Sequence, residues 1–219
     1  MQVTVIDYKA GNLTSVVKAL RHLGAEVTVT ESSQDVAEAQ RIVLPGVGHF
    51  AATARLDDTG LTPAIREAIT RGVPFLGICV GMQWLLEGSS EAPNQPGLGY
   101  FHAHCERFPE GKEKVPHVGW NTILPHTDPE GQSTRLMSGI QAAGGDNFAY
   151  FTHSYYVPAG VVFRAPATPA KEPIAAVTRY INVFASAVEH RNVFGVQFHP
   201  EKSGETGLKI LKNFLEISA

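Results

Sequence analysis

The stretch VPFLGICVGMQWLLEG at residues 73–88 places Cys79 between Gly77 and Gly81, where an apolar strand-like run meets a helix-like run. A G-x-C-x-G sequence at such a junction is typical of a nucleophile elbow, the tight turn that lifts a side chain clear of a sheet. The start of the helix favours a thiolate, and its free N–H groups can hold an oxyanion. Cysteine is also commonly a small buried hydrophobic residue. A nucleophilic Cys79 therefore requires a base elsewhere in the chain.

The segment FGVQFHPEKSG at 194–204 supplies the best candidate base, His199, directly after an apolar strand-like run. Pro200 biases His199 toward extended backbone, and in an extended chain residues i and i+2 point the same way. We therefore expect Glu201 to lie beside the imidazole, fix its tautomer and stabilise the imidazolium. A surface His-Pro-Glu turn is the plain alternative, because the chain has nine histidines. A strand-end cysteine and a strand-end histidine together favour a catalytic triad.

The elements that must position these residues alternate between strand and helix in the first half of the chain. Strands are predicted over 3–7, 26–30, 41–46 and 73–78, and helices over 13–24, 62–72 and 80–88. This alternation predicts βαβ units and a mostly parallel sheet, which binds ligands at the carboxyl ends of its strands. Cys79, Gly46 and Tyr8 all follow such ends, so we expect them to share one rim.

The second half of the chain has strand-like segments divided by Pro- and Gly-rich turns, and it predicts antiparallel additions to the sheet. An amphipathic helix is predicted over 208–217, and residues 158–173, with four prolines, predict a loop. We expect a single α/β domain spanning residues 1–219.

Composition restricts the classes of partner. With 43% hydrophobic residues and a net charge of −3, the chain gives no electrostatic reason to expect nucleic acid or an anionic membrane. It contains no run of 18 apolar residues. Its two cysteines, Cys79 and Cys105, are too few for a disulfide framework, which favours a reducing, cytoplasmic setting.

Two competing motifs are weaker. LPGVGHFA contains G-x-G-x-x-A after a strand, with Glu67 about twenty residues on, but the fingerprint requires that acid at the end of the next strand and Glu67 falls inside a predicted helix. We therefore predict no dinucleotide cofactor. His102, His104 and Cys105 suggest a metal cluster, but in a strand Cys105 would point away from His104. We interpret them as structural or surface residues and predict no metal.

Several stretches together resemble a known family. GICVGMQ with FGVQFHPEKSG resembles the class I, or triad, glutamine amidotransferases. DYKAGNLTSV, LPGVG, KVPHVGWN and THSYYV make the chain similar to the glutaminase subunits of imidazole glycerol phosphate synthase, of histidine biosynthesis. The similarity runs from about residue 3 to 214. It implies a flavodoxin-like three-layer sandwich with a mostly parallel central sheet and antiparallel additions in the C-terminal half.

The resemblance also implies roles for single residues. Cys79 would attack the carboxamide of L-glutamine, His199 would carry the proton to the departing ammonia, and Glu201 would orient His199. Backbone N–H groups of Val80 and of Val47 or Gly48 would form the oxyanion hole.

Substrate contacts and a partner follow from the same resemblance. Gln83 would contact the glutamine, and the pocket would be lined by His153, Ser154 and Tyr155. The partner would be a (β/α)₈-barrel cyclase in a heterodimer, which uses the ammonia to convert PRFAR to imidazole glycerol phosphate and AICAR. A mobile LPGVG loop would let the ligand of the cyclase complete the oxyanion hole.

The residues expected to face that partner are Asn12, Trp120, Asn121 and Lys202. Each also has an ordinary explanation: a helix cap for Asn12, an edge strand with a core tryptophan for Trp120 and Asn121, and a solvated surface for Lys202. The chain departs from the common family pattern at Lys9, where glycine is frequent, and at Val80, where leucine is usual.

Other functions remain to be weighed. A glutaminase for the pyridoxal phosphate or anthranilate pathway is possible within the class, although THSYYV and KVPHVGWN argue against it. A cysteine peptidase or γ-glutamyl hydrolase would use the same triad without a barrel partner. A flavodoxin-like module without catalysis would leave Cys79 unreactive toward a glutamine-analogue label.

Overall fold

The computed structural model describes residues 1–10, 13–111, 113–127, 131–141, 147–159 and 174–218. Within these ranges the main sheet has eight strands in the order β2-β1-β3-β4-β13-β12-β11-β8. Its first five strands run parallel, and they are β1 (Gln2–Ile6), β2 (Glu26–Thr30), β3 (Ile42–Gly46), β4 (Phe75–Cys79) and β13 (Val193–Val196). The βαβ pattern predicts the first four, but the expectation of an antiparallel addition is wrong for β13, which pairs parallel with β4. The order 2-1-3-4 at its start is that of flavodoxin-like folds.

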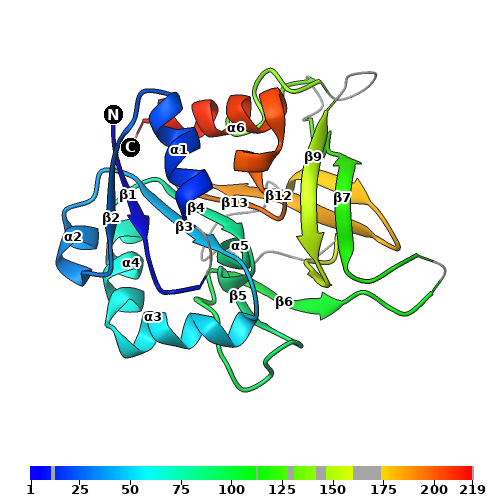
Figure 1. Ribbon diagram of the computed structural model, residues 1–219, viewed down its shortest axis with the longest axis horizontal. Helices are drawn as coiled ribbons and strands as arrows, with labels where there is room; N and C mark the ends of the chain where they lie inside the picture. Colours follow the sequence, from blue (N-terminus) through cyan, green and yellow to red (C-terminus); the bar gives the residue numbers. More distant parts are fainter. Residues whose placement is uncertain (11–12, 112, 128–130, 142–146, 160–173, 219) are drawn as a thin grey trace.

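Helices cover both faces of this sheet, which gives three layers (Figure 1). On one face lie α1 (Thr14–His22) and α6 (Gly204–Glu216), which come from opposite ends of the chain. The other helical elements are α2 (Ser33–Ala37), η1 (Phe50–Thr53), α3 (Ala54–Asp58), α4 (Leu61–Thr70), α5 (Val80–Trp84) and η2 (Pro200–Lys202). Helix α1 turns Val16, Val17 and Leu20 into the core at the spacing that predicted it. Among the described residues, no helix is both long and apolar enough to cross a bilayer.

The second half of the chain adds antiparallel strands to the main sheet, as predicted. These are β12 (Val183–His190), β11 (Ile174–Arg179) and β8 (Leu124–Pro125). The prediction was incomplete for the remaining strand-like segments, which form two small sheets of their own. One contains β5 (Leu86–Ser89), β6 (Phe101–Arg107) and β10 (Tyr155–Tyr156), and the other pairs β7 (His117–Thr122) with β9 (Phe148–His153). Figure 1 shows β7 and β9 standing beside the main sheet.

The helix predicted over 80–88 was too long, because it ends at Trp84 and the chain enters β5. Leu86 pairs with Phe101 of β6, and its carbonyl accepts the N–H of Gly99. Gly97 packs so closely on this segment that a Cβ there would overlap the Leu86 carbonyl. Pairing with a distant strand therefore overrides the helical pattern of the sequence.

Candidate active site

Cys79 lies at a tight elbow between β4 and α5. Its φ of 54° is in the left-handed region, which non-glycine residues rarely adopt and which typically costs about 1–3 kcal/mol. A Cβ on Gly77 would overlap the Gly81 carbonyl, and one on Gly81 would overlap the Leu44 carbonyl. The two glycines therefore allow β4, β3 and α5 to approach closely enough to impose this conformation.

The rim expected around Cys79 is present. Gly46 pairs directly with Cys79 across β3 and β4. Any side chain on Gly46 would overlap the hydroxyl of Tyr8, which is buried. Burial, followed by the nearby sulfur of Cys79, raises the pKa of Tyr8, so its hydroxyl stays neutral.

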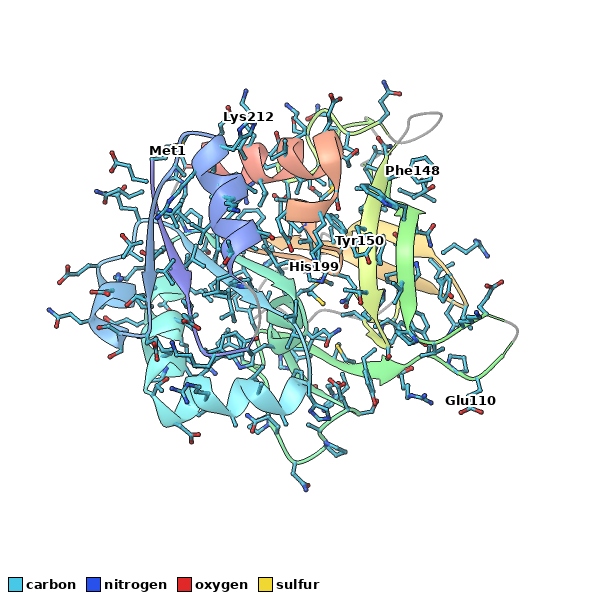
Figure 2. The ribbon with its side chains drawn as sticks, viewed as in Figure 1. Met1, Glu110, Phe148, Tyr150, His199 and Lys212 are labelled. Atoms are coloured by element: carbon cyan, nitrogen blue, oxygen red, sulfur yellow. The ribbon has the colours of Figure 1, made fainter. Side chains whose placement is uncertain are left out.

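His199 and Glu201 meet as expected, but through different backbone geometry. The His199 Nδ1 to Glu201 Oε1 distance is 2.9 Å, and both side chains are almost fully buried. The expected extended chain is wrong beyond His199, because Pro200–Lys202 form the 3₁₀ turn η2. The Ser203 hydroxyl donates to the His199 carbonyl at 2.6 Å and stabilises the turn. Figure 2 shows His199 near the centre of the molecule, beside Tyr150 of β9.

The electrostatics of His199 favour its protonated form. Burial lowers the pKa of His199, but hydrogen bonding and charge from Cys79 and Glu201 outweigh it and raise the pKa to about 10. At neutral pH His199 is therefore an imidazolium between a carboxylate and a sulfur atom. An imidazolium at this place can supply a proton to a leaving group.

A pocket of about 250 Å³ opens in front of Cys79. It brings together the predicted nucleophile, both parts of the predicted oxyanion hole and every predicted substrate residue. Its lining consists of Val47, Gly48, Cys79, Val80, Gln83, Glu91, Pro116, Thr152, His153, Ser154 and Tyr155. His199 and Glu201 do not line it and lie behind the cysteine, next to Pro45 and Val47.

Glu91 is a pocket residue that the sequence analysis missed. Its Oε2 accepts the Phe50 N–H at 2.7 Å, which fixes the carboxylate at the pocket wall. No local pattern marks this residue, because Glu91 lies in a turn between β5 and β6.

Gln197 is a second missed residue. It is fully buried, and its Nε2 donates to Cys79 Sγ at 3.6 Å. The alternation rule applied to His199 and Glu201 could have found it, because that rule holds on the strand side of His199, where Gln197 is residue i−2.

The loop carrying Val47 and Gly48 is held differently from the elbow. The Val47 N–H donates to the Ala10 carbonyl at 3.3 Å, so it does not point into the pocket. Gly48 has a φ of 103°, and nothing lies within 4 Å of the place where its Cβ would be. The peptide between these two residues thus has space to change its orientation.

The pocket wall formed by β9 contains a chain of neutral groups. His153 Nδ1 lies 2.8 Å from the Tyr155 carbonyl, so it must donate, and His153 Nε2 accepts from His117 Nδ1 at 3.0 Å. Asn121 Nδ2 then donates to His117 Nε2 at 3.2 Å. Burial lowers the pKa of His117 to about 4 and that of His153 to about 3, so both rings stay neutral at physiological pH.

The residues predicted to face a partner lie in different environments. Trp120 is 57% exposed on β7 and contacts Tyr150 edge-on, with ring centroids 6.1 Å apart. Lys202 places its ammonium 5.7 Å from the same Tyr150 ring. The Asn121 amide instead bonds inward, to His117 and the Arg179 carbonyl. Asn12 lies outside the described residues.

The competing motifs have ordinary surroundings. Glu67 lies within α4 and pairs with Arg71 one turn on. His102 and His104 are exposed and approach Glu87, at 2.9 Å and 3.6 Å. Cys105 is fully buried on the other side of β6.

Comparison with known families agrees with this geometry. A family model described as "Glutamine amidotransferase class-I" matches residues 4–217. The chain belongs to the class-I glutamine amidotransferase family. Solved structures of a glutamine amidotransferase and of PurLQS from Thermotoga maritima superpose with TM-scores of 0.70 and 0.69. Each covers 98% of this chain and 97% of its own, at 20% and 19% identity, and these likenesses support the fold alone.

Curated relatives narrow the assignment within the glutamine amidotransferases. Proteins from Moorella thermoacetica and Deinococcus radiodurans are each 43% identical, over 98% and 97% of this chain and 94% and 92% of their own length. One from Caldanaerobacter subterraneus is 42% identical over 97% of both chains. All three are named imidazole glycerol phosphate synthase subunit HisH. The subfamily resemblance predicted from the sequence motifs is thereby confirmed.

Proposed function

We propose that this glutamine amidotransferase is the glutaminase subunit of imidazole glycerol phosphate synthase, with Cys79 as nucleophile, His199 as acid and base, and Glu201 as the group that orients His199. The observation that carries the proposal is the buried His199–Glu201 pair of 2.9 Å behind a cysteine that opens onto a 250 Å³ pocket. A structural cysteine would need neither the protonated imidazole nor the pocket.

Each residue then has a defined step. The Cys79 thiolate attacks the carboxamide carbon of glutamine, and His199 Nε2 gives its proton to the departing ammonia. Water next attacks the thioester with His199 as base, which releases glutamate and restores the imidazolium. Glu201 holds the ring through Nδ1, so Nε2 is the nitrogen that exchanges the proton.

The pocket offers groups for the two ends of glutamine. The carboxylate of Glu91 suits the α-ammonium, because it is the acidic side chain in the lining. Gln83 donates through Nε2 to the Tyr155 carbonyl and to Gln197 Oε1, so its own Oε1 is left to accept from the substrate. His153, Ser154 and Tyr155 form the opposite wall.

The oxyanion hole is the incomplete part of the site. Val80 supplies one N–H at the elbow, and the second comes from Val47 or Gly48 once the peptide that carries that N–H turns toward the pocket. The Val47 N–H, in the Gly46–Val47 peptide, is held away at rest by its bond to the Ala10 carbonyl. Losing one such donor typically costs about 10²–10³ in rate. Binding of ligand to a partner can therefore raise the activity by shifting the loop population.

The partner we propose is a cyclase subunit, a (β/α)₈ barrel that forms a heterodimer with this chain in the cytoplasm. It would receive ammonia and convert PRFAR to imidazole glycerol phosphate and AICAR. The exposed face around Trp120, Tyr150 and Lys202 suits such a contact, because aromatic side chains are enriched in interfaces and Lys202 can pair with an acid on the partner. Asn12 and Asn121 are further candidates, the latter through the backbone of β7.

The test is Cys79→Ala in the complex with the cyclase. Glutamine-dependent synthesis should fall at least about 10⁴-fold, because nucleophilic catalysis is lost. Synthesis from added ammonium salt should stay at the wild-type rate, because the cyclase is untouched. Cys105→Ala is the matched control, since Cys105 is buried away from the pocket, and it should retain both activities. Retained glutamine-dependent synthesis in Cys79→Ala would contradict the proposed function.

A further inference from the structure

Gln197 is a buried side chain that the proposed triad leaves without a role. It follows β13 directly, and its N–H donates to the Ser186 carbonyl, so the ladder with β12 extends through it. His199, two residues on, also has extended backbone, with φ −99° and ψ 95°. Gln197 and His199 therefore point to the same side, while Phe198 between them is buried in the core. Gln197 thereby places an amide beside the sulfur of Cys79.

The orientation of the Gln197 amide follows from its neighbours. The Tyr155 carbonyl can only accept a hydrogen bond, so the Gln83 atom 3.1 Å from it is the nitrogen. The same nitrogen lies 3.0 Å from the Gln197 side chain, which must present its oxygen there. A reversed Gln197 would set two NH₂ groups against each other and turn its oxygen toward the sulfur. The network thus directs the Gln197 N–H at Cys79 Sγ, 3.6 Å away.

This network is anchored on both sides of the pocket. The Tyr155 carbonyl also accepts from His153 Nδ1 at 2.8 Å. Gln83 is 3% exposed and Gln197 is fully buried, so water does not compete for these bonds. A donor held in place before the reaction needs no reorganisation when charge develops on its acceptor.

We propose that Gln197 is a catalytic residue whose side-chain N–H stabilises the Cys79 thiolate, both before attack and when the sulfur leaves the thioester. This inference rests on the proposed function, because it requires Cys79 to be the nucleophile. Hydrogen bonds to charged acceptors are roughly twice as strong as neutral ones. The amide therefore acts on the states in which sulfur carries a charge and little on the neutral thioester.

The electron balance shows where the donor acts. In the first step the thiolate pair forms the S–C bond, and ammonia leaves with the proton from His199. In the second step water attacks the thioester and gives a proton to His199 Nε2. The C–S bond then breaks with its electron pair returning to Sγ, where the Gln197 N–H is in place. The Thr152 carbonyl, 4.0 Å from the sulfur, can only accept, so it favours the protonated thiol and cannot replace this donor.

Alkylation of Cys79 by iodoacetamide in the full-length chain tests the proposal. Gln197→Met keeps a similar volume without a donor, and Gln197→Glu places a carboxylate beside the sulfur. At pH 7 we expect alkylation to be about tenfold slower in Gln197→Met, because a bond to a charged group is lost. Gln197→Glu should be slower still, and in both variants the half-maximal rate should move to higher pH. If Gln197 served only in packing, the pH profile of alkylation would match that of the wild type, and Gln197→Glu would not be slower than Gln197→Met.

The matched control is Asn213→Leu. Asn213 is another buried amide; it lies on α6, away from the thiol, and donates to the Leu136 and Ser138 carbonyls. This variant should lose stability and keep the wild-type alkylation profile. If the Gln197 variants fail to fold, the side-chain amide resonances of Gln197 in the wild-type chain provide the second measurement. They should shift with pH as the thiol ionises, and this shift should be absent in Cys79→Ala.

Failure of the role of Gln197 and failure of the proposed function give different experimental results. If Cys79→Ala keeps glutamine-dependent synthesis, the nucleophile assignment fails, and this inference fails with it. If Cys79→Ala loses that activity but folded Gln197→Met alkylates at the wild-type rate and pH, only the role of Gln197 is overturned. Equal rates in Gln197→Met and Gln197→Glu, or amide resonances that ignore the thiol, would also overturn it.

Discussion

The two segments that meet at the pocket, the Cys79 elbow and the Val47–Gly48 loop, differ in how firmly they are held. At the elbow, Gly77 is enclosed by the backbone of α5 and Gly81 by that of β3, and a Cβ at either position would overlap a carbonyl. At the loop, Gly48 has open space around it, and the Val47 N–H has a single 3.3 Å bond to a neighbouring loop. The proposed nucleophile is thus prebuilt by packing, whereas the N–H of Val47, one of the two proposed oxyanion donors, is held by one replaceable hydrogen bond.

The rigid elbow and the loosely held loop have separate tasks in the proposed function. A reacting sulfur needs a fixed position, because small misplacements cost large factors in rate. A glutaminase that supplies a partner benefits if it does not hydrolyse glutamine alone. In the proposed function, freedom in the loop would let the partner control the rate without disturbing the nucleophile.

Substitution of a glycine at the elbow and of one in the loop tests this difference most directly. Gly81→Ala should destabilise the fold by about 3 kcal/mol or more, because the added Cβ meets the Leu44 carbonyl in the packed centre of the sheet and has no route of escape. Urea unfolding followed by circular dichroism measures the loss, and failure to accumulate as folded protein is the extreme form of the same result.

Gly48→Ala is the matched change in the loop. Its Cβ meets nothing within 4 Å, and its φ of 103° can relax into open space, so we expect a loss of about 1 kcal/mol. If both substitutions cost the same, the contrast between elbow and loop is wrong.

The elbow was predictable from sequence because its determinants are local. Gly77, Cys79 and Gly81 lie within five residues, and the strand before them has a clear apolar pattern. The four parallel strands of the first half were predictable for the same reason, since each is a short apolar run followed by a turn signal.

What could not be predicted depends on contacts between distant segments. Leu86–Ser89 has a helical pattern but pairs with β6, and β7 pairs with β9 across a long connection. Glu91 enters the pocket through its contact with Phe50, forty-one residues away, and no spacing rule reports such a contact. Gln197 was within reach of the alternation rule, which we applied to the wrong side of His199.

The pocket wall formed by β9 is rigid like the elbow. Because it contains the buried His153, the stability of the folded chain should depend on pH. The pKa of His153 is lowered to about 3, whereas the unfolded chain has the ordinary value of about 6.5, so the unfolded state binds more protons below pH 6.5. Stability should therefore fall as the pH drops from about 6.5 toward 3, by roughly 1 kcal/mol per pH unit from this residue. Urea unfolding at about pH 4.5, 5.5 and 6.5 measures the slope.

The variant that isolates this effect is His153→Leu. Unfolding at acid pH should then take up about one proton fewer, so the free energy of unfolding should depend less steeply on pH. His102→Gln, at an exposed histidine of β6, is the control and should keep the wild-type slope more closely. An unchanged slope in His153→Leu would mean that His153 is protonated in the folded chain and that the wall is looser than its hydrogen bonds suggest.

The smallest expected effect concerns Lys9, which precedes Ala10 in the loop after β1. Its φ of 63° is in the left-handed region, and its ammonium pairs with Asp7 at 2.9 Å and also with Glu31. These contacts hold the loop that carries the Ala10 carbonyl, the acceptor for Val47. Lys9→Gly removes the backbone strain together with the exposed ion pairs, so the melting temperature should move by less than about 4 °C. The loop itself should loosen, and the Val47 amide should exchange with solvent roughly threefold faster. Exchange at Ile78, in the strand before the elbow, should stay unchanged, because no contact of Lys9 reaches it. Hydrogen exchange followed by NMR distinguishes the two sites, and equal acceleration at Val47 and Ile78 would show that loop and elbow open as one unit.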